Sequence, residues 1–509
     1  VLVPSGYRDS KLYSQKPLST DGELTFTRSN DTATRVNSSG LIEKVRTNVA
    51  LYSNDFSNAA WAKLDNATVS GIRVADPFGG NTAWQVIFDG SSNGRIEQTI
   101  GSLINNGTYT TSFYLRVASG TVSAFVINDA VTITTTWQRF SSIETITGTD
   151  AYPRLRCNTA ATIQVYAGQF ELSDFGATDY IATTSAAVSV GPVANLPRLD
   201  YSGGCPSLLL EPQRTNLLQY SDGLVPAQAF GATLTKNSIV SPDGYQNASL
   251  FTPSGGAGGV TLMTSSFSGY YTISVYLKGS VNGQKVRAFG DLQSTIIDWT
   301  ITTEWVRYTA TFNATNPTGQ SIYLLAGSYF TPSQNNPFYV YGAQIEAGAY
   351  ATSYIPTIAA TTRGAEVCNL LSMSSGVASG ATAGTLFIEL EHKLNSTAGD
   401  SFVFGQTNGT FPAGRGYIYA ADSGFADSFG GGGFAIPQSQ TVKMIFRMNS
   451  LSNANIFQNG VKGATVSGTA WAAINSIQFR GAYASMKVKQ ILFSKSALTD
   501  AQCIELTTL

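Results

Sequence analysis

The chain has 509 residues, enough for about three or four domains. Only 12% of the residues are charged and the net charge is -1, which gives no electrostatic basis for binding nucleic acid or an anionic membrane. The 43% apolar content can fill real cores, which excludes a disordered chain, and no apolar run is long enough to cross a membrane.

The first 45 residues form a leader that we expect to contain short strands. Residues 24–27 alternate apolar and polar side chains, and Asp21-Gly22 and residues 37–40 are turn signals. The leader has too few apolar residues to bury a core of its own. We therefore expect it to lie against another domain or another subunit.

A β-rich module then occurs twice, as module 1 (residues 46–187) and module 2 (residues 214–365), with matching landmarks about 168 residues apart. Residues 109–117 alternate strictly, and residues 271–278 repeat the pattern. Strict alternation predicts a half-buried antiparallel strand, and several such strands between Gly-rich and Asn-rich turns predict a β-sandwich in each copy. The other matched stretches are residues 46–53 with 214–221, 137–140 with 305–308, and 165–171 with 340–346.

Two segments separate the domains. The connector, residues 188–213, contains four prolines and Gly203-Gly204, which predicts an ordered segment outside any sheet. The linker, residues 366–383, ends in a long run of small residues.

The C-terminal domain, residues 384–509, differs from both modules. Residues 385–391 and 442–448 alternate as strands, and Asn459-Gly460 predicts the type I′ turn of a hairpin. Thr499 and Gln502 have the spacing of a capping box, which predicts a short helix near the end of the domain.

The cysteines and the single histidine have no metal-ligand spacing. Cys157, Cys205, Cys368 and Cys503 are widely separated, and His392 stands alone. We therefore expect no zinc site, and buried free thiols rather than disulfides.

Three groups of residues resemble known proteins: residues 34–43, residues 197–216, and residues 341–346 with 351–357. They are similar to structural proteins of tailed bacteriophages, including head fibres, tail fibres and capsid decorations. In such proteins the modules resemble carbohydrate-binding jelly rolls. Through the Asn459-Gly460 hairpin and residues 497–501, the C-terminal domain resembles the laminin-G/concanavalin-A-like fold. The resemblance implies an all-β protein with two tandem jelly-roll-like β-sandwiches and a C-terminal concanavalin-A/laminin-G-like β-sandwich.

The strongest candidate for catalysis is the strand that carries Glu389 and Glu391, with His392 beside them. Two carboxylates on one strand face could serve a retaining glycosidase. Lys393 occupies the position two residues further on, where a third acidic residue is missing. A solvated strand face is the favoured interpretation of the two glutamates. We therefore assign no catalytic residue and expect a protein that is not an enzyme.

The tryptophans are the first candidates for sugar stacking. Trp137 and Trp305 recur at matching positions, which predicts core anchors, and Trp61 is also expected to be packed. Trp84, Trp299 and Trp471 have no counterpart in the other copy, and they are the tryptophan candidates for carbohydrate binding.

A Gly-rich loop of the C-terminal domain, residues 417–434, adds three more candidates. Tyr417, Asp422 and Asp427 could contact sugar hydroxyls, and the two aspartates could help to hold Ca²⁺. A solvated loop is the favoured interpretation. No metal site is assigned, and Ca²⁺ is the only cofactor considered.

The favoured function is a structural and adhesive component on the exterior surface of a tailed-phage virion. We expect it to display carbohydrate-binding domains toward host-surface glycans, to attach to other virion proteins through the leader, and to form a homotrimer or a homodimer. We expect no nucleic acid partner and no membrane insertion. Two alternatives remain: a glycan depolymerase with its active site in the C-terminal domain, and a purely architectural spacer. The glycan and the head or tail location stay open.

Overall fold

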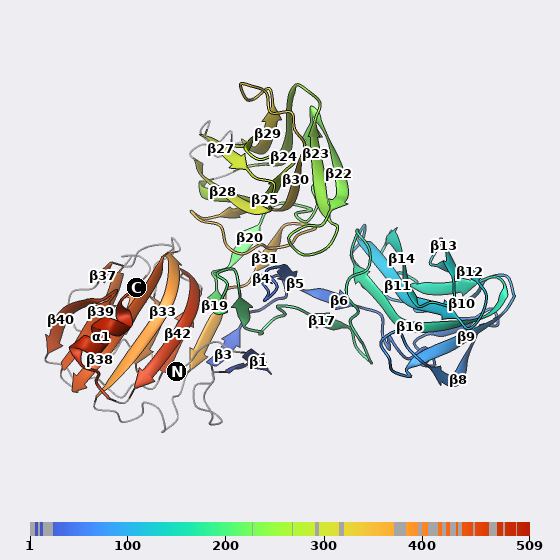
Figure 1. Ribbon diagram of the computed structural model, residues 1–509, viewed down its shortest axis with the longest axis horizontal. Coiled ribbons are helices and arrows are strands. Elements are labelled where there is room, and N and C mark those ends of the chain that lie inside the picture. The colour runs from blue at the N-terminus through green and yellow to red at the C-terminus, as the bar shows by residue number, and fades with distance from the viewer. Residues whose placement is uncertain are drawn as a thin grey trace. The chain divides into compact units, whose positions relative to one another are not determined.

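The computed structural model shows an all-β protein (Figure 1). The residues it describes are 6–8, 11–13, 24–225, 228–266, 268–290, 295–314, 320–370, 383–394, 400–405, 416–419, 424–427, 434–435, 440–450, 453–467, 476–481, 484–494 and 496–509. The one helix in this part of the chain is α1 (Asp500–Thr507). Within the described residues, no helix has both the length and the apolar character needed to cross a membrane. The predicted fold class is confirmed, and each β-sandwich is described below.

The chain divides into two compact units. The first contains residues 1–44, 192–244 and 248–509, and the second contains residues 45–191 and 245–247. The second unit therefore corresponds closely to the predicted module 1, coloured blue to cyan in Figure 1. The first unit holds the leader, the connector, module 2 and the C-terminal domain.

Module 1 is a sandwich of two five-stranded antiparallel sheets. One sheet has the order β13-β12-β15-β10-β7 and the other has the order β14-β11-β16-β9-β8. The strands of the first sheet are β7 (Ala62–Leu64), β10 (Gly94–Glu97), β12 (Val122–Val126), β13 (Asp129–Ile133) and β15 (Arg154–Cys157). The strands of the second are β8 (Thr68–Val74), β9 (Ala83–Asp89), β11 (Thr108–Val117), β14 (Gln138–Thr145) and β16 (Ala160–Leu172).

Module 2 repeats the same strand orders. Its sheets run β27-β26-β29-β24-β21 and β28-β25-β30-β23-β22. The strands of the first are β21 (Ala229–Phe230), β24 (Ala257–Ser265), β26 (Gln284–Gly290), β27 (Thr295–Ile301) and β29 (Gln320–Gly327). The strands of the second are β22 (Ala232–Ile239), β23 (Ala248–Pro253), β25 (Gly269–Gly279), β28 (Val306–Ala314) and β30 (Phe338–Ala347). The repeat in the sequence is therefore a repeat of topology.

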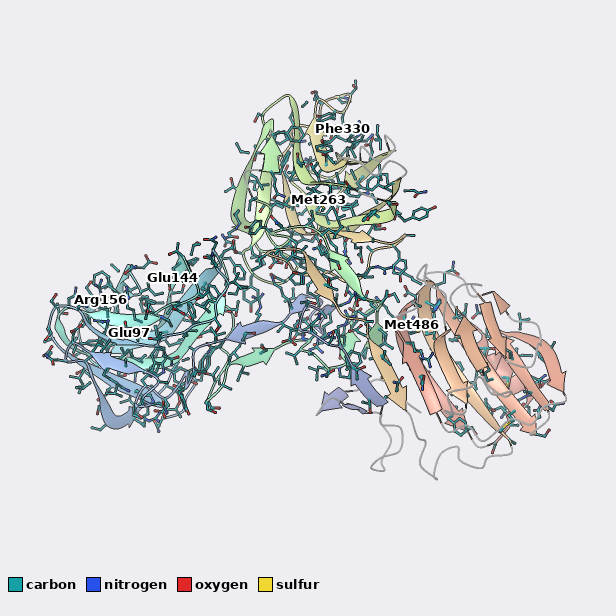
Figure 2. The ribbon with its side chains drawn as sticks, turned by 180° about the vertical axis from the view of Figure 1, so that it is seen from behind. Glu97, Glu144, Arg156, Met263, Phe330 and Met486 are labelled. Atoms are coloured by element: carbon teal, nitrogen blue, oxygen red, sulfur yellow. The ribbon has the colours of Figure 1, made fainter. Side chains whose placement is uncertain are left out.

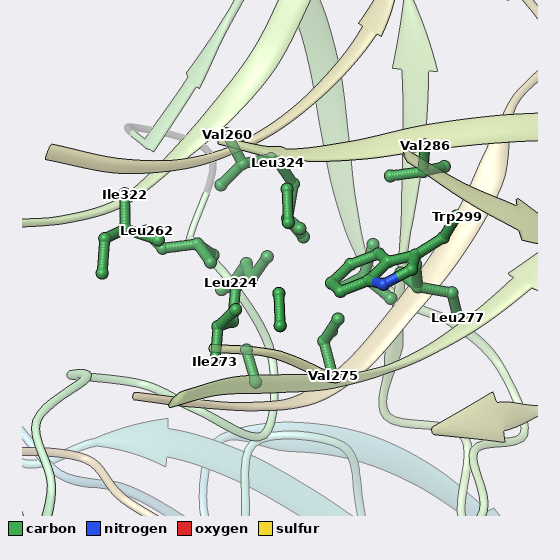
Figure 3. Packing of buried hydrophobic residues seen from close by; sticks show 14 of the residues in the cluster. Leu224, Val260, Leu262, Ile273, Val275, Leu277, Val286, Trp299, Ile322 and Leu324 are labelled. Carbon is green, nitrogen blue, oxygen red and sulfur yellow. The ribbon is translucent and has the colours of Figure 1, made fainter. Parts of the chain in front are cut away.

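The alternating strands fill the space between the sheets in both copies. In module 1 the inward side chains of β11, including Phe113 and Leu115, pack with Trp61, which confirms that Trp61 belongs to the core. In module 2, Ile273, Val275 and Leu277 of β25 meet Val260 and Leu324 of the opposite sheet (Figure 3). Burial of such side chains is the main force that holds two sheets face to face.

The same polar clasp closes each module. The amide of Asn48 donates to the carbonyls of Gly168 and Ile181, and its oxygen accepts from the backbone of Ala50 and Phe170. Asn216 makes the matching bonds in module 2, to the carbonyls of Ala343 and Ile355 and from Leu218 and Ile345. These bonds tie the entry strands β6 (Arg46–Asn48) and β20 (Arg214–Asn216) to the last long strand of each module and to the segment that follows it.

The exit from each module pairs with its entry. Strand β17 (Val188–Val190) pairs with β6, and β31 (Thr361–Arg363) pairs with β20. The segment after β16 also covers part of the outer face of module 1, since Thr110 donates to the carbonyl of Ser173. Thr110 and Ser112 are therefore buried although they point away from the sandwich core.

The C-terminal sandwich is built from four parts of the chain. Its seven-stranded sheet has the order β18-β19-β42-β33-β38-β39-β40, and its nine-stranded sheet has the order β1-β2-β3-β32-β41-β34-β35-β36-β37. The strands of the seven-stranded sheet are β18 (Arg198–Asp200), β19 (Ser207–Leu210), β33 (Gly384–Leu394), β38 (Thr441–Ser450), β39 (Asn453–Gln458), β40 (Val461–Ser467) and β42 (Ala484–Ser494).

The strands of the nine-stranded sheet are β1 (Gly6–Arg8), β2 (Lys11–Tyr13), β3 (Leu24–Thr27), β32 (Val367–Leu370), β34 (Asp400–Gly405), β35 (Gly416–Tyr419), β36 (Gly424–Asp427), β37 (Phe434–Ala435) and β41 (Ser476–Arg480). Leader strand β3 pairs with β32, and connector strand β19 pairs with β42. Phe26 of the leader, Leu208 of the connector and Met486 of β42 share one core (Met486 is labelled in Figure 2).

Two expectations need correction here. The connector is not outside the sheets, because β18 and β19 form a hairpin and extend the seven-stranded sheet. The linker is not a spacer throughout, because its residues 367–370 form β32 between two other strands. Prolines at 197, 206 and 212 flank these short strands rather than interrupt them, so their missing N–H groups remove no ladder bond. The expectation that the leader lies against another domain is confirmed by β3.

The local predictions for the C-terminal domain are confirmed. β39 and β40 form the hairpin, and Asn459 and Gly460 both have positive φ, as a type I′ turn requires. The side chain of Thr499 accepts from the N–H of Gln502 and completes the capping box of α1.

The cysteines are unpaired. Cys157, Cys368 and Cys503 are buried as expected, whereas Cys205, in the turn between β18 and β19, is exposed.

Candidate functional site

The outer face of module 1 carries a group of aromatic side chains, which we call the aromatic patch: Phe78, Tyr114, Tyr166 and Tyr180. Tyr114 of β11 and Tyr166 of β16 are register partners, with ring centroids 6.3 Å apart. Phe78 lies 5.5 Å from Tyr114 and 5.9 Å from Tyr166, and Tyr180 lies 5.8 Å from Tyr166. The four rings therefore form one contiguous group, in which Phe78 is exposed and the three tyrosines are half-buried.

Phe78 is held out toward solvent by the loop between β8 and β9. Its side chain is 67% exposed, which is unusual for a phenylalanine. The carboxylate of Asp76 organises the loop, because it accepts from the N–H groups of Phe78 at 2.9 Å and Gly80 at 3.0 Å and from the hydroxyl of Thr82 at 2.7 Å. Burial acts to raise the pKa of Asp76, but these hydrogen bonds outweigh it and lower the pKa. The loop is thus built around an ionised carboxylate.

Guanidinium groups border the aromatic patch. Arg139 of β14 lies 5.4 Å from the Tyr114 ring centroid and donates to the hydroxyl of Ser112 at 3.0 Å. Arg116 lies 4.9 Å from the Trp137 ring centroid and donates to Gln164 at 2.5 Å. Flat rings can stack on the apolar faces of sugars, and guanidinium and amide groups can bond to sugar hydroxyls. Both kinds of group are present on this face.

Module 2 carries the same framework, but its aromatic face is covered. Tyr276 and Tyr341 are register partners, as Tyr114 and Tyr166 are, and Arg307 pairs with Tyr276 as Arg139 pairs with Tyr114. Tyr354 bonds to Ser221 at 2.7 Å, and Tyr180 bonds to Ser53 at the same distance. The two sites therefore share their geometry.

The cover in module 2 is the leader hairpin of β4 (Thr34–Val36) and β5 (Ile42–Lys44). Ile42 packs against Tyr341 and Tyr354 in a small buried cluster. Lys44 pairs with Asp222 at 2.5 Å and Asp243 at 3.1 Å, and its ammonium lies 5.7 Å from the Tyr341 ring centroid. Burial raises the pKa of Tyr341 and of Tyr354 well above the usual value, so both hydroxyls stay protonated.

The first two tryptophan candidates do not form a sugar platform. Trp84 is 6% exposed in the core of module 1 and donates to the carbonyl of Asn54, and Arg73 covers its ring at 3.4 Å. Trp299 is 7% exposed in the core of module 2 and donates to the carbonyl of Thr309 (Figure 3). Assigning these two residues to carbohydrate binding was wrong, because an indole buried between sheets offers no ring face to a ligand.

The remaining candidates lie in the C-terminal sandwich. Trp471 and Asp422 are outside the described residues. Tyr417 and Asp427 belong to β35 and β36, where the structure describes the backbone only. Their proposed contact with sugar or Ca²⁺ stays a prediction. Among the described side chains, no group of three His, Cys, Asp or Glu residues could hold a metal ion.

Trp137 and Trp305 were expected to be core anchors, and both are only partly buried. Trp305 packs beside the cluster around Ile42 and donates to the carbonyl of Val240 at 3.1 Å. Trp137 lies under Arg116 at the border of the aromatic patch. Both tryptophans are structural residues, and each lies on the outer face of its module rather than in the core.

Glu389 and Glu391 of β33 line two different pockets. Glu391 lines a pocket with Lys393 and Lys487, whereas Glu389 lines a different pocket with Lys443 and Gln490. His392 points to the opposite, buried face, and burial lowers its pKa to about 4. It is therefore a neutral core residue at physiological pH.

A buried ionic cluster includes Arg198 and Glu211 of residues 197–216, and Arg198 also donates to the carbonyl of Thr34 and the hydroxyl of Ser353 in the other two stretches that carry the resemblance. Glu366 accepts from Arg28 at 2.7 Å and from Arg198 at 2.7 Å, and Arg198 also pairs with Glu211 at 2.9 Å. Arg363 pairs with Glu211 at 2.8 Å. All five side chains are buried. Arg198 and Glu211 are therefore structural.

Sequence reasoning missed Phe78, Tyr114 and Tyr166. Recurring residues were expected to be framework, but recurrence does not decide exposure: Tyr166 is half-buried, whereas its counterpart Tyr341 is buried. A usable signal was present: Tyr114 and its counterpart Tyr276 stand on the outer face of the alternating strand, where a large aromatic side chain has no core to fill.

The sequence matches no protein-family model and no curated protein. Its structure is similar to several solved structures at low identity. The tandem CBM22-1–CBM22-2 domain of Xyn10C from Paenibacillus barcinonensis has 12% identity and a TM-score of 0.23, over 59% of this chain and 96% of that chain. CBM40 of the Ruminococcus gnavus IT-sialidase has 14% identity and a TM-score of 0.20, over 25% of this chain and 83% of that chain. The plant receptor-like kinase FER has 11% identity and a TM-score of 0.21, over 59% of this chain and 93% of that chain. At these scores, none of them assigns a ligand to this chain.

Proposed function

We propose that this chain is a non-catalytic glycan-binding protein displayed on the exterior of a tailed-phage virion, with the aromatic patch of module 1 as its sugar-binding surface. The observation that carries the proposal is the open group of Phe78, Tyr114 and Tyr166 beside Arg116 and Arg139. A protein that needed these rings only for stability would bury them, as module 2 does with Tyr341 and Tyr354.

A single site of this kind binds weakly. Stacking on solvent-accessible rings and hydrogen bonds to partly exposed guanidinium groups compete with water, and only the surplus appears as affinity. Display of several copies raises the effective affinity without any new contact. This supports the proposed oligomer, for which we keep the homotrimer first and the homodimer second.

The virion part of the proposal is supported by the resemblance of residues 34–43 and 197–216 to phage structural proteins. Much of the leader is used within this chain, since β3 completes the C-terminal sandwich and β5 covers module 2. Strand β1 stands at an edge of its sheet. An edge strand has unpaired backbone groups, so we assign attachment to other virion proteins to this end of the leader.

The test is a glycan array probed with the full chain and with the Phe78→Ala and Tyr114→Ala variants. We expect binding to host-surface glycans to fall about ten-fold or more, which corresponds to about 1.4 kcal/mol. Tyr152→Ala is the matched control, because Tyr152 is an exposed tyrosine of the same module outside the aromatic patch. Failure of the full chain to bind any glycan, or equal binding by all variants, would contradict the proposed site.

The virion location has its own test. Antibodies against the full chain should label the outside of intact phage particles in electron micrographs. Label that appears only after the particles are broken would contradict exterior display.

A further inference from the structure

The first compact unit contains a partly open pocket of about 320 Å³, with polar and apolar lining, where four parts of the chain meet. Module 2 contributes Tyr276, Arg307 and Tyr354 to its lining. These residues are the counterparts of Tyr114, Arg139 and Tyr180 in module 1. The pocket therefore borders the face of module 2 that corresponds to the aromatic patch, although Tyr341, the counterpart of Tyr166, is buried and does not line it.

The walls come from segments that module 1 does not have around its patch. The leader contributes Arg35, the connector contributes Asp200 and Ser202, and the C-terminal sandwich contributes Glu391, Lys393, Ser485 and Lys487. Arg35 pairs with Glu43 at 2.7 Å, and Lys487 pairs with Asp200 at 3.3 Å. The pocket lining thus includes carboxylates, cations and hydroxyls together with Tyr276.

This lining fits a small polyhydroxylated ligand. Sugar hydroxyls donate to carboxylates and accept from ammonium and guanidinium groups. The volume lies at the low end of the roughly 300–1,000 Å³ typical of small-molecule sites, so the pocket cannot hold a long polymer. The open patch of module 1, by contrast, sets no limit on ligand length.

We infer that this pocket is a second sugar site, which takes a mono- or disaccharide or the terminal unit of a glycan. The inference rests on the proposed function, because it reads the shared tyrosine and arginine framework as a sugar-binding framework. Module 1 then binds along a glycan chain, and module 2 binds the end of a glycan.

The test is calorimetric titration of the full chain with free glucose, N-acetylglucosamine, glucuronic acid and N-acetylneuraminic acid. We expect at least one sugar to bind in the millimolar range or better. Ser485→Trp should weaken that binding about ten-fold or more, because an indole from this half-buried position fills the pocket. Lys489→Trp is the matched control, since Lys489 is a half-buried position on the same strand outside the pocket lining.

Glu391→Gln provides a second, milder variant that changes one wall group and no core contact, and it should also weaken binding. No binding of any of the four sugars, or full binding by both Ser485→Trp and Glu391→Gln, would overturn the inference. The site in module 2 and the aromatic patch of module 1 can be contradicted independently of each other. Ser485→Trp should leave polymeric glycan binding at module 1 unchanged, and Tyr114→Ala should leave binding of the free sugar unchanged.

Discussion

Tyr166 and Tyr341 stand at the same position of the two modules, each paired across the sheet with a second tyrosine, yet only Tyr341 is sealed from solvent. The difference arises from Ile42 and Lys44 of the leader, which lie against Tyr341. One framework thus yields an open aromatic face in module 1 and a covered one in module 2. The predictions below test this difference and the contacts that maintain it.

The leader cover should contribute to the stability of the first unit. Ile42→Ala removes a buried side chain from between Tyr341 and Tyr354, and we expect a loss of about 2–4 kcal/mol in the free energy of unfolding. Leu41→Ala is the control, because Leu41 is 38% exposed and should cost about 0.5 kcal/mol or less. Urea denaturation followed by tyrosine fluorescence measures both. Equal losses would mean that the cover is not packed as described.

The buried ionic cluster should depend on Glu366. Glu366→Gln leaves Arg28 and Arg198 buried with one fewer countercharge, and we expect a loss of about 3–5 kcal/mol in stability. Glu43→Gln, which breaks the more exposed pair with Arg35, should cost about 1 kcal/mol or less. Thermal unfolding of the two variants at low and high salt makes the comparison. A small loss of stability in the Glu366→Gln variant would show that the buried cluster does not stabilise the fold as proposed.

His392 should make stability depend on pH. Burial holds its folded-state pKa at about 4, below the ordinary histidine value of 6.5, so the unfolded chain binds a proton more readily. Its contribution is fully present above about pH 6.5 and is lost as the pH falls toward 4, by up to about 3 kcal/mol. Urea midpoints at pH 7.5 and pH 5 should show this decline in the native protein.

The His392→Leu variant isolates the histidine from the carboxylates that titrate over the same range. It should show a smaller decline in stability between pH 7.5 and pH 5 than the native protein. Identical declines in the two proteins would assign the pH dependence to other groups.

The asparagine clasps should act on one module each. Asn48→Ala removes four hydrogen bonds in module 1, and Asn216→Ala removes four in module 2. Unsatisfied buried backbone groups cost about 1–3 kcal/mol each, so each variant should lose several kcal/mol locally. Hydrogen exchange followed by mass spectrometry should show loss of protection in β16 for the first variant and in β30 for the second. Loss in both modules from one variant would contradict independent clasps.

The sequence by itself determined the local features and the repeat. Period-two alternation marked β11 and β25 because neighbouring side chains of a strand must point to opposite faces. The turn at Asn459-Gly460 and the Thr499–Gln502 capping box depend only on residues close together in the chain. They could therefore be predicted without knowledge of the tertiary fold. The duplication of topology followed from the duplication of sequence.

Only the tertiary structure decided which surfaces are open. Strand β3 finds its partner β32 more than three hundred residues away, and no local pattern specifies such a pairing. Trp84 and Trp299 appeared available because they were unmatched, yet each is buried against side chains from distant strands. Burial depends on everything that packs against a residue, including segments remote in sequence. For that reason the sequence showed that Tyr166 and Tyr341 are alike, and only the fold showed that the leader covers one of them.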